Sequence, residues 1–380
     1  MTQTEHPNTE TSSPFPLAER RDRATVVEIG GVPIGGPELV LVAGPCSVES
    51  ESQLREAAHA ARAAGATVLR GGAFKPRTSP YAFQGLGEEG LALLRRIGDE
   101  TGMAVVTEAL DPTQVSLVAS YADAIQIGSR NMHVAPLLRA AGASGLPVLL
   151  KRGMSATLEE FLLAAETILL EDNERVVLCE RGIRTFDSYT RNCLDVGGIA
   201  ALKRLTHLPV LADPSHATGR RELVVDTALA AIAGGADGLV VEAHADPPSA
   251  LSDRDQQLSP EELAELAERA RRVALAVGRS LPGAQVESQI EEQPLDGFVD
   301  RLREEISEND RGIVEAINTR LALVARMHSY KAARGIAFRD ARRERALLRS
   351  LQETNGGPLS PEGLEEILLA LLELTKREVA

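Results

Sequence analysis

A divalent metal ion could be bound by four side chains that are far apart in the chain: Cys46, His216, Glu242 and Asp253. Each of them follows a short apolar run that the residue pattern predicts to be a β-strand. A thiolate, an imidazole and two carboxylates form a ligand set that Mn²⁺, Fe²⁺, Co²⁺ and Zn²⁺ all tolerate. The basic side chains of Lys75–Thr78, after another such run, suit a phosphorylated or carboxylated substrate. The sequence therefore predicts an enzyme with a metal site beside an anion site.

The elements that must position these side chains are eight apolar runs, most of them short, continuous and rich in Val, Leu and Ile. Such runs are typical of parallel strands that are buried on both faces. They are Leu39–Ala43, Thr67–Arg70, Ala104–Thr107, Ala124–Ile127, Val148–Lys151, Val176–Cys179, Val210–Ala212 and Leu239–Val241. Helical patterns lie between them, and eight β-α units favour a (β/α)₈ barrel, whose typical length is about 250 residues. A doubly wound sheet is the alternative, which eight regular repeats disfavour.

The chain is predicted to divide into four parts. Residues 1–24 are polar and lack periodicity, which indicates a disordered tail. Residues 25–278 are predicted to form the barrel, with an N-terminal β-hairpin that turns at Gly30-Gly31 and closes the barrel bottom. Residues 279–296 contain Pro and Gly among Gln and Glu, which indicates a linker. Residues 297–380 are predicted to form an all-α domain of three helices. The first of these would exceed ~50 Å at ~1.5 Å per residue, so we expect it to pair with a second chain.

The composition restricts the classes of protein to which the chain could belong. Its 380 residues are 43% hydrophobic and 25% charged, as in soluble globular proteins. A formal net charge of -14 argues against nucleic acid or an anionic membrane as a partner. No apolar stretch is long enough to span a bilayer, and the N-terminal segment lacks the regions of a signal peptide. Three cysteines fit a reducing compartment, so the protein is predicted to be cytoplasmic.

Charged and polar residues follow almost every predicted strand. In (β/α)₈ barrels the active site lies at the carboxyl ends of the strands. Besides the four possible metal ligands, these ends carry Arg70, Lys75, Glu108, Ser129, Arg130, Lys151 and Arg181. One such residue alone could be a solvated loop charge, but the whole set predicts an active site.

The motifs that contain these residues resemble those of the 3-deoxy-arabino-heptulosonate 7-phosphate (DAHP) synthase family. They read GPCS, LRGGAFKPRTSPYAFQGLG, LLKRG, CERGIRTF, DPSH and LSDRDQQ, and the resemblance runs from about Leu39 to Ala270. It implies condensation of phosphoenolpyruvate with erythrose 4-phosphate. It also implies one divalent metal ion per barrel, most readily Mn²⁺, bound by the four side chains named first. The related 3-deoxy-octulosonate 8-phosphate synthases are the alternative, but in them a different, Asn-containing stretch replaces Lys75–Thr78.

The same resemblance implies which residues bind the two substrates. The carboxylate of phosphoenolpyruvate would be held by Arg70, Lys75 and Lys151, and its phosphate by Arg130 and Arg181, with Ser129 beside them. Erythrose 4-phosphate would be bound by Pro76, Arg77 and Thr78, the last two holding its phosphate. Two small anions must be held in an aligned pose, which bidentate Arg does better than Lys. The predicted catalytic residues of the barrel are Lys75 and Glu108, where either Glu108 or a metal-bound water could transfer the proton.

The helical domain resembles the all-helical chorismate mutase family over most of Leu295–Arg377. On the first helix Arg320 and Lys331 are about three turns apart and share a face, whereas Arg303 lies roughly 100° away. The resemblance implies a pocket lined by Arg320, Lys331, Asp340, Arg343 and Glu344, with Arg303 donated by a second chain. Lys331 and Glu344 would be catalytic, Lys331 as donor to the breaking ether bond and Glu344, with Asp340, on the substrate hydroxyl side. The family usually adds a Gln or Glu late in its third helix as a second donor to the ether oxygen, and here that position could be Thr375, Lys376, Glu378 or Val379.

The sequence therefore predicts a bifunctional shikimate-pathway enzyme that acts on phosphoenolpyruvate, erythrose 4-phosphate and chorismate. Because the two domains are fused, we also expect prephenate to inhibit the barrel by binding the helical domain. The alternative is a helical domain that acts only as a sensor and dimerisation module. The expected assembly is a homodimer through the helical domain, or a homotetramer.

Overall fold

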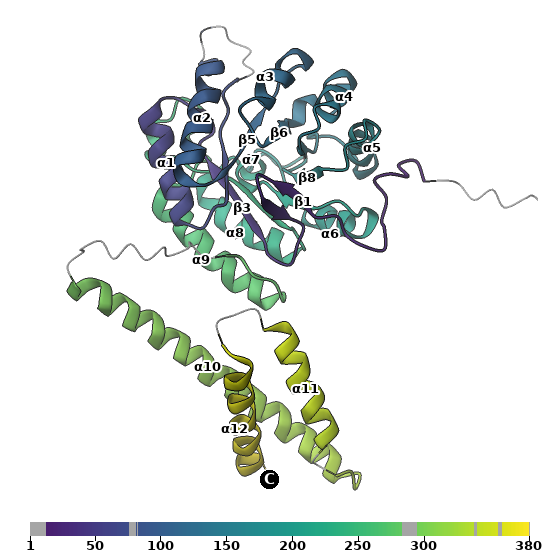
Figure 1. Cartoon of the computed structure of the whole chain (residues 1–380), viewed down its shortest axis with the longest axis vertical. Coiled ribbons are helices and arrows are strands. Elements are labelled where there is room, and N and C mark those ends of the chain that lie inside the picture. The colour runs from purple at the N-terminus through teal and green to yellow at the C-terminus, as the bar shows by residue number, and fades with distance from the viewer. Residues whose placement is uncertain are drawn as a thin grey trace, which may run out of the picture. The chain divides into compact units, whose positions relative to one another are not determined.

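The computed structural model describes residues 13–75, 81, 83–282, 295–337, 340–355 and 359–379. The chain forms two compact units, Met1–Val286 and Glu287–Ala380, each of which is described here by itself (Figure 1). No helix among the described residues is both long enough and apolar enough to cross a membrane.

The first unit is a closed barrel of eight parallel strands. The strands are β3 (Val40–Gly44), β4 (Val68–Arg70), β5 (Ala104–Glu108), β6 (Ala124–Ile127), β7 (Val148–Lys151), β8 (Val176–Glu180), β9 (Val210–Ala212) and β10 (Gly238–Glu242). Neighbours in sequence are neighbours in the sheet, and β10 pairs with β3 to close it. The prediction of a (β/α)₈ barrel is confirmed, and the doubly wound alternative is wrong.

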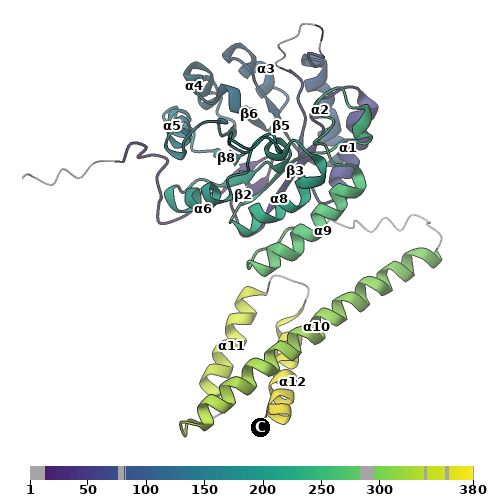
Figure 2. The ribbon, with the colours of Figure 1, turned by 180° about the vertical axis from the view of Figure 1, so that it is seen from behind.

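Helices surround the strands in the barrel unit (Figures 1 and 2). They are α1 (Glu51–Ala63), α2 (Glu88–Thr101), α3 (Val115–Ala119), α4 (Ala135–Ala143), α5 (Leu158–Leu169), α6 (Val196–Leu205), α7 (Pro214–Thr218), α8 (Arg221–Ala233) and α9 (Pro260–Ala276). One hydrophobic core lies between strands and helices, where residues such as Leu69 and Ile97 are fully buried. The strand residues of alternate register, among them Val106 and Leu149, fill the barrel interior as a second core. This alternation leaves the carboxyl ends of the strands as the place for polar side chains.

A β-hairpin, β1 (Val27–Ile29) and β2 (Val32–Ile34), belongs to the same core as the barrel interior. Its turn requires glycine: Gly30 has φ +54, and an added Cβ would lie 2.6 Å from the Cβ of Ala104 at the start of β5. The hairpin therefore closes the amino-terminal end of the barrel, as predicted.

Residues 13–24 differ from the disordered tail predicted for residues 1–24. The backbone amides of Leu17 and Ala18 donate hydrogen bonds to the buried carboxylate of Glu166, and Ala18 is fully buried. The ring of His207 is hydrogen-bonded to the carbonyl of Leu17 at 2.8 Å. This segment is thus anchored across α5 and the end of α6.

The second unit contains α10 (Leu295–Ala332), α11 (Ala341–Thr354) and α12 (Pro361–Val379). The 38 residues of α10 correspond to roughly 57 Å, about twice the length of α12. Within this unit, α11 and α12 lie along the carboxyl-terminal half of α10 (Figure 1). Ile306 and Ile313, on the other half, are 60% and 51% exposed. The predicted three-helix domain is confirmed, and among the described residues of this unit its first helix carries exposed apolar side chains.

Candidate active sites

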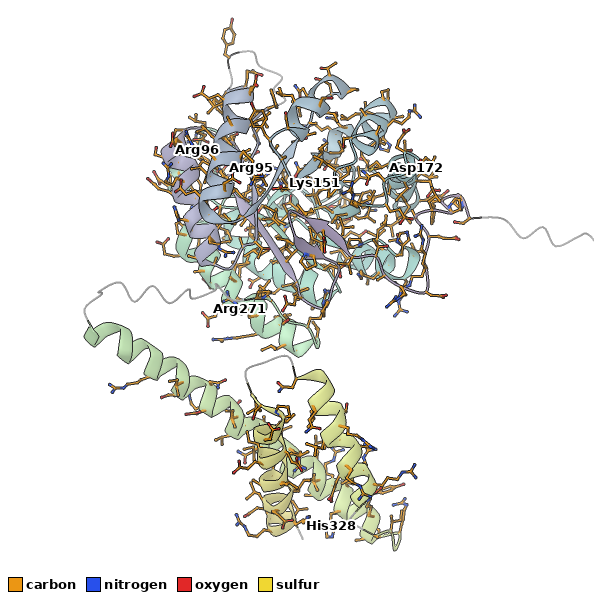
Figure 3. The ribbon with its side chains drawn as sticks, viewed as in Figure 1. Arg95, Arg96, Lys151, Asp172, Arg271 and His328 are labelled. Carbon is orange, nitrogen blue, oxygen red and sulfur yellow. The ribbon has the colours of Figure 1, made fainter. Side chains whose placement is uncertain are left out.

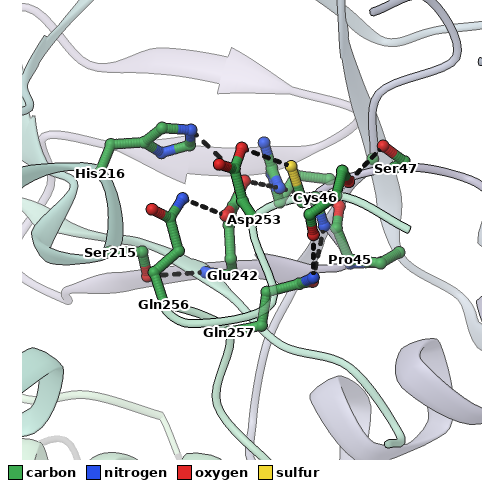
Figure 4. A network of polar contacts seen from close by, with 12 residues as sticks. Pro45, Cys46, Ser47, Ser215, His216, Glu242, Asp253, Gln256 and Gln257 are labelled. Carbon is green, nitrogen blue, oxygen red and sulfur yellow. Dashed lines mark hydrogen bonds and ion pairs between the residues drawn. The ribbon is translucent and has the colours of Figure 1, made fainter. Parts of the chain in front are cut away.

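The four predicted metal ligands meet at the carboxyl end of the barrel (Figure 4). Cys46 follows β3, Glu242 ends β10, and the loop after β10 carries Asp253. The ligand atoms of these three residues all lie within 4.8 Å of one another. His216, on α7, lies beside them with its Nε2 atom 3.4 Å from Oε1 of Glu242. Donor atoms that share one metal ion at about 2.0–2.3 Å lie at most about 4–5 Å apart, so the spacing fits a single ion.

Buried polar residues hold two of these ligands in place. Nε2 of Gln256 donates to Oε2 of Glu242 at 2.5 Å, and Oε1 of Gln257 accepts from the backbone amide of Cys46 at 2.9 Å. Asp253 adopts φ 45, a left-handed conformation that is rare outside glycine and is found at functional sites. Sequence reasoning missed both glutamines as site residues, although the motif LSDRDQQ contains them.

Asp213 orients His216 and was also missed. Its Oδ2 atom lies 2.8 Å from Nδ1 of His216 and accepts from Nζ of Lys151 at 2.5 Å. Such a contact fixes the imidazole with its other nitrogen, Nε2, toward the ligand cluster. Figure 3 labels Lys151, which ends β7, among the side chains of the barrel.

The electrostatics of the cluster suit a cation. Burial, followed by the charge of Glu242, raises the pKa of the Cys46 thiol to about 12. Burial alone would raise the pKa of Glu242, but His216 and Arg70 lower it well below its usual range. Arg70 donates from Nη1 to Oε1 of Glu242 at 2.7 Å. Glu242 is therefore ionised, whereas Cys46 needs a nearby positive charge to become a thiolate ligand.

A cavity of about 250 Å³ adjoins the cluster. Its lining includes most of the predicted site residues of the barrel: Arg70, Lys75, Glu108, Ser129, Arg130, Lys151, Arg181, His216 and Asp253. Nζ of Lys75 lies 3.2 Å from Sγ of Cys46. The cations that line the cavity are Arg70, Lys75, Arg130, Lys151, Arg181 and Arg191. The cavity can therefore hold a multiply charged anion next to the ligand cluster.

Three predicted residues of the barrel site, Pro76, Arg77 and Thr78, lie outside the described residues. Arg191 was not predicted, and its Nη2 atom donates to Oδ1 of Asp253 at 3.4 Å. No motif singled it out, because it lies in the loop beyond CERGIRTF. Glu108, at the end of β5, accepts a 3.5 Å hydrogen bond from Gln126 and faces the same cavity.

A second cavity, of about 590 Å³, lies within the helical unit. Its charged lining residues are Arg320 and Lys331 on α10, Asp340, Arg343 and Glu344 at the start of α11, and Lys376 on α12. Oδ1 of Asp340 caps α11 by accepting from the backbone amides of Arg342 and Arg343. The hydrogen bonds from those amides, above all the one from Arg343, lower the pKa of the Asp340 carboxyl. All predicted residues of this pocket meet except Arg303, which is exposed on α10 and lines no part of it.

The cavity lining also reduces the number of candidates for the Gln or Glu position late in the third helix. Of the four residues considered, Thr375 and Lys376 line the cavity. Nη1 of Arg320 donates to Oγ1 of Thr375, which in turn donates to the carbonyl of Leu371 at 2.6 Å. The buried Thr375 hydroxyl thus joins α12 to a cation on α10.

Comparison with known proteins identifies both regions. The DAHP synthetase I family model matches residues 19–277, and the chorismate mutase type II model matches residues 302–379. A phospho-2-dehydro-3-deoxyheptonate aldolase of Thermotoga maritima is 51% identical over 267 residues, which cover 70% of this chain and 79% of that protein. A 2-dehydro-3-deoxyphosphooctonate aldolase of Koribacter versatilis is 30% identical over 247 residues, covering 60% of this chain and 87% of that protein.

Solved structures give the same result for the barrel. The crystal structure of the Thermotoga maritima aldolase, also described as a DAHP synthase, has 49% sequence identity and a TM-score of 0.70. That match covers 72% of this chain and 80% of the other. A truncated form of the Thermotoga maritima synthase has 46% identity and a TM-score of 0.66, covering 70% of this chain and 99% of the other.

Proposed function

Because the chain belongs to the DAHP synthetase I family and carries a C-terminal chorismate mutase type II domain, we propose that its synthase reaction depends on a divalent metal and responds to prephenate. The two domains make the protein a bifunctional enzyme of the shikimate pathway. The proposal for the barrel rests above all on one observation: Cys46, His216, Glu242 and Asp253 converge beside a cavity lined by six cations.

In the barrel, the cations would bind phosphoenolpyruvate and align it with the sugar phosphate. Arg70, Lys75 and Lys151 would hold its carboxylate, and Arg130 and Arg181 its phosphate. When bound, the metal ion would polarise the aldehyde oxygen of erythrose 4-phosphate as a Lewis acid. Charge that develops on that oxygen would be stabilised by cations that are already in place around the cavity.

The remaining step is addition of water to the former enol carbon, with loss of phosphate. A proton must leave that water. Among the described carboxylates that line the cavity, Glu108 is the one that forms no hydrogen bond with an arginine or lysine of the cavity wall. We therefore propose that Glu108, which accepts a hydrogen bond from Gln126, takes up this proton.

Metal removal is expected to abolish the synthase activity and leave the mutase activity intact. Phosphate release from phosphoenolpyruvate plus erythrose 4-phosphate would be measured before and after chelation. Loss of the Lewis acid removes several kcal/mol of transition-state stabilisation, so turnover should fall by at least about 100-fold. Addition of Mn²⁺ should restore it, with Fe²⁺, Co²⁺ and Zn²⁺ compared in parallel.

Full turnover in a sample shown to contain no metal would contradict the metal dependence. Turnover with a five-carbon sugar phosphate but not with erythrose 4-phosphate would instead contradict the substrate. The relative that is 51% identical favours the four-carbon substrate over that of the octonate aldolases, which are 30–35% identical.

In the helical domain, the cavity of α10, α11 and α12 would bind chorismate. Its two carboxylates would contact Arg320 and Arg343, while Lys331 donates to the ether oxygen. A second chain would cover the uncovered half of α10 and bring its Arg303 to the cavity. The exposed Ile306 and Ile313 support this homodimer, since apolar side chains on a helix are stabilised by burial.

Prephenate is expected to lower synthase turnover in the full chain, because its two carboxylates would bind in the same cationic cavity. The measurement is phosphate release across a prephenate titration at fixed Mn²⁺. In Arg343→Ala the inhibition should require at least about tenfold more prephenate, since each 1.4 kcal/mol of lost binding corresponds to a factor of ten. Turnover that is indifferent to prephenate would show two independent catalysts on one chain.

A further inference from the structure

A third cavity, the rim cavity, has a volume of about 620 Å³ and lies at the carboxyl end of the barrel. Its lining comes from three segments that follow strands β8, β9 and β10: residues 189–191, 218–222 and 248–255. Of these lining residues, Arg191 also lines the cavity beside the ligand cluster. The volume is within the range of about 300–1,000 Å³ that is typical of small-molecule sites.

Backbone hydrogen bonds join the three segments. The amide of Arg191 donates to the carbonyl of Thr218 at 2.9 Å, and the amide of Arg221 donates to the carbonyl of Asp255 at 2.7 Å. Gly219 has φ +64, and an added Cβ would lie 2.8 Å from the Cβ of Arg191. Glycine at this position therefore permits the close approach of two segments. The walls of the rim cavity are thus held together by the backbone itself.

The lining of the rim cavity has an excess of positive charge. The four cations are Arg191, Arg220, Arg221 and Arg254, and the two acids are Glu222 and Asp255. Four positive and two negative groups leave a formal charge of +2, in a chain whose formal net charge is -14. Cations that are held close together repel one another, and a bound anion offsets that repulsion. The rim cavity is therefore suited to a dianion.

Two of these arginines offer their guanidinium groups to a ligand. Arg254 is exposed and forms no hydrogen bond or ion pair with any residue that the structure describes. The guanidinium of Arg220 lies over the ring of Tyr189, 4.3 Å from its centroid, and Nε donates to the carbonyl of Tyr189 at 2.6 Å. These contacts fix the plane of the Arg220 guanidinium before a ligand binds. Because guanidinium groups bind phosphate through two parallel hydrogen bonds, the arrangement favours a phosphate group.

Arg191 links the rim cavity to the proposed metal site. It lines both cavities, and its Nη2 atom donates to Oδ1 of Asp253 at 3.4 Å. An anion in the rim cavity would compete with Asp253 for this guanidinium. Phosphorylated molecules enter and leave the barrel at this end in the proposed reaction, so ligands of the right chemistry are supplied there.

We propose that the rim cavity is a second anion site, which binds the phosphate group of a small molecule through Arg220, Arg221 and Arg254. The ligand is either inorganic phosphate or the phosphate group of a sugar phosphate. The three arginines line no part of the cavity beside the ligand cluster, so both sites can be filled at once. The cavity and its charge are independent of the proposed function, on which only the source of the ligand rests.

The test is isothermal titration calorimetry of the full chain with inorganic phosphate, in saturating phosphoenolpyruvate to fill the cavity beside the ligand cluster. Saturable binding of phosphate is expected. Arg254→Gln should raise the Kd of one site by at least about tenfold, the usual loss for a hydrogen bond between charged groups. Arg254→Lys should recover part of this loss, because it keeps the charge. Arg139→Gln is the matched control: Arg139 is exposed on α4, lines neither cavity, and should be replaceable without effect on the Kd.

A second titration, with erythritol 4-phosphate, distinguishes the two sources of the ligand. This molecule lacks the aldehyde and therefore cannot react. If the site that Arg254→Gln weakens binds it more tightly than inorganic phosphate, the ligand is a sugar phosphate; if not, the ligand is inorganic phosphate.

Three results would overturn the inference: no saturable binding of phosphate to the parent, a Kd in Arg254→Gln within twofold of the parent, or an equal rise in Kd in Arg139→Gln. None of these titrations requires turnover. A chain without synthase activity would therefore contradict the proposed function, while the comparison of Arg254→Gln with Arg139→Gln would still decide whether the rim cavity binds phosphate.

Discussion

Replacement of Cys46 by alanine is expected to reduce synthase turnover by at least about 1000-fold, the equivalent of about 4 kcal/mol of activation free energy. The thiol contributes Sγ to the ligand cluster, 3.2 Å from both Oδ2 of Asp253 and Nζ of Lys75. Alanine leaves three ligands and removes one of the negative charges that attract a cation. Phosphate release and the metal content of the purified protein would be measured on the same sample.

The chain offers a matched control for this variant. Cys193 is an exposed free thiol outside the ligand cluster, so Cys193→Ala should keep both turnover and metal. Mutase activity should persist in both variants, because the helical unit is separate. A Cys46→Ala protein that binds metal and turns over at the parent rate would remove the thiol from the proposed site.

The barrel, and the meeting of the four proposed metal ligands at one end of it, were predictable because the information is local. Each strand is a short buried run, and each ligand comes directly after its strand or in the loop that follows. The closed topology then brings the strand ends together without any further assumption. This is why the sequence alone places Cys46 and Glu242, nearly 200 residues apart, at one predicted site.

The supporting residues were not predictable in the same way. The role of Asp213 depends on two partners, Lys151 and His216, that reach it from different elements. Arg191 faces the cavity beside the ligand cluster only because its loop folds back toward Asp253. For such residues it is the tertiary contact, and not the local sequence pattern, that places them at the site. The order of residues 13–24 has the same origin, since the carboxylate of Glu166 accepts hydrogen bonds from the backbone amides of Leu17 and Ala18.

The third helix of the mutase domain shows the limit of helical periodicity. The pattern near the end of the chain left four positions open, because a small error in helix register moves the inward face. Packing resolves the register: Thr375 is buried against Arg320, and Lys376 follows it into the cavity wall. The family match confirms the domain over residues 302–379, while the residue roles within it stay proposals.

Replacement of Arg343 by alanine is expected to lower mutase kcat/KM by about 1000-fold, or about 4 kcal/mol, because it leaves a substrate carboxylate without its charged partner. Arg342 is the matched control: both arginines open α11 with backbone amides bonded to Asp340, but only Arg343 lines the cavity. Arg342→Ala should therefore stay within about threefold of the parent, as surface substitutions do. Chorismate consumption measures both variants, with synthase turnover as the internal reference. Equal losses in the two variants would mean that the start of α11 contributes through helix stability, and that the cavity between α10, α11 and α12 is not where chorismate binds.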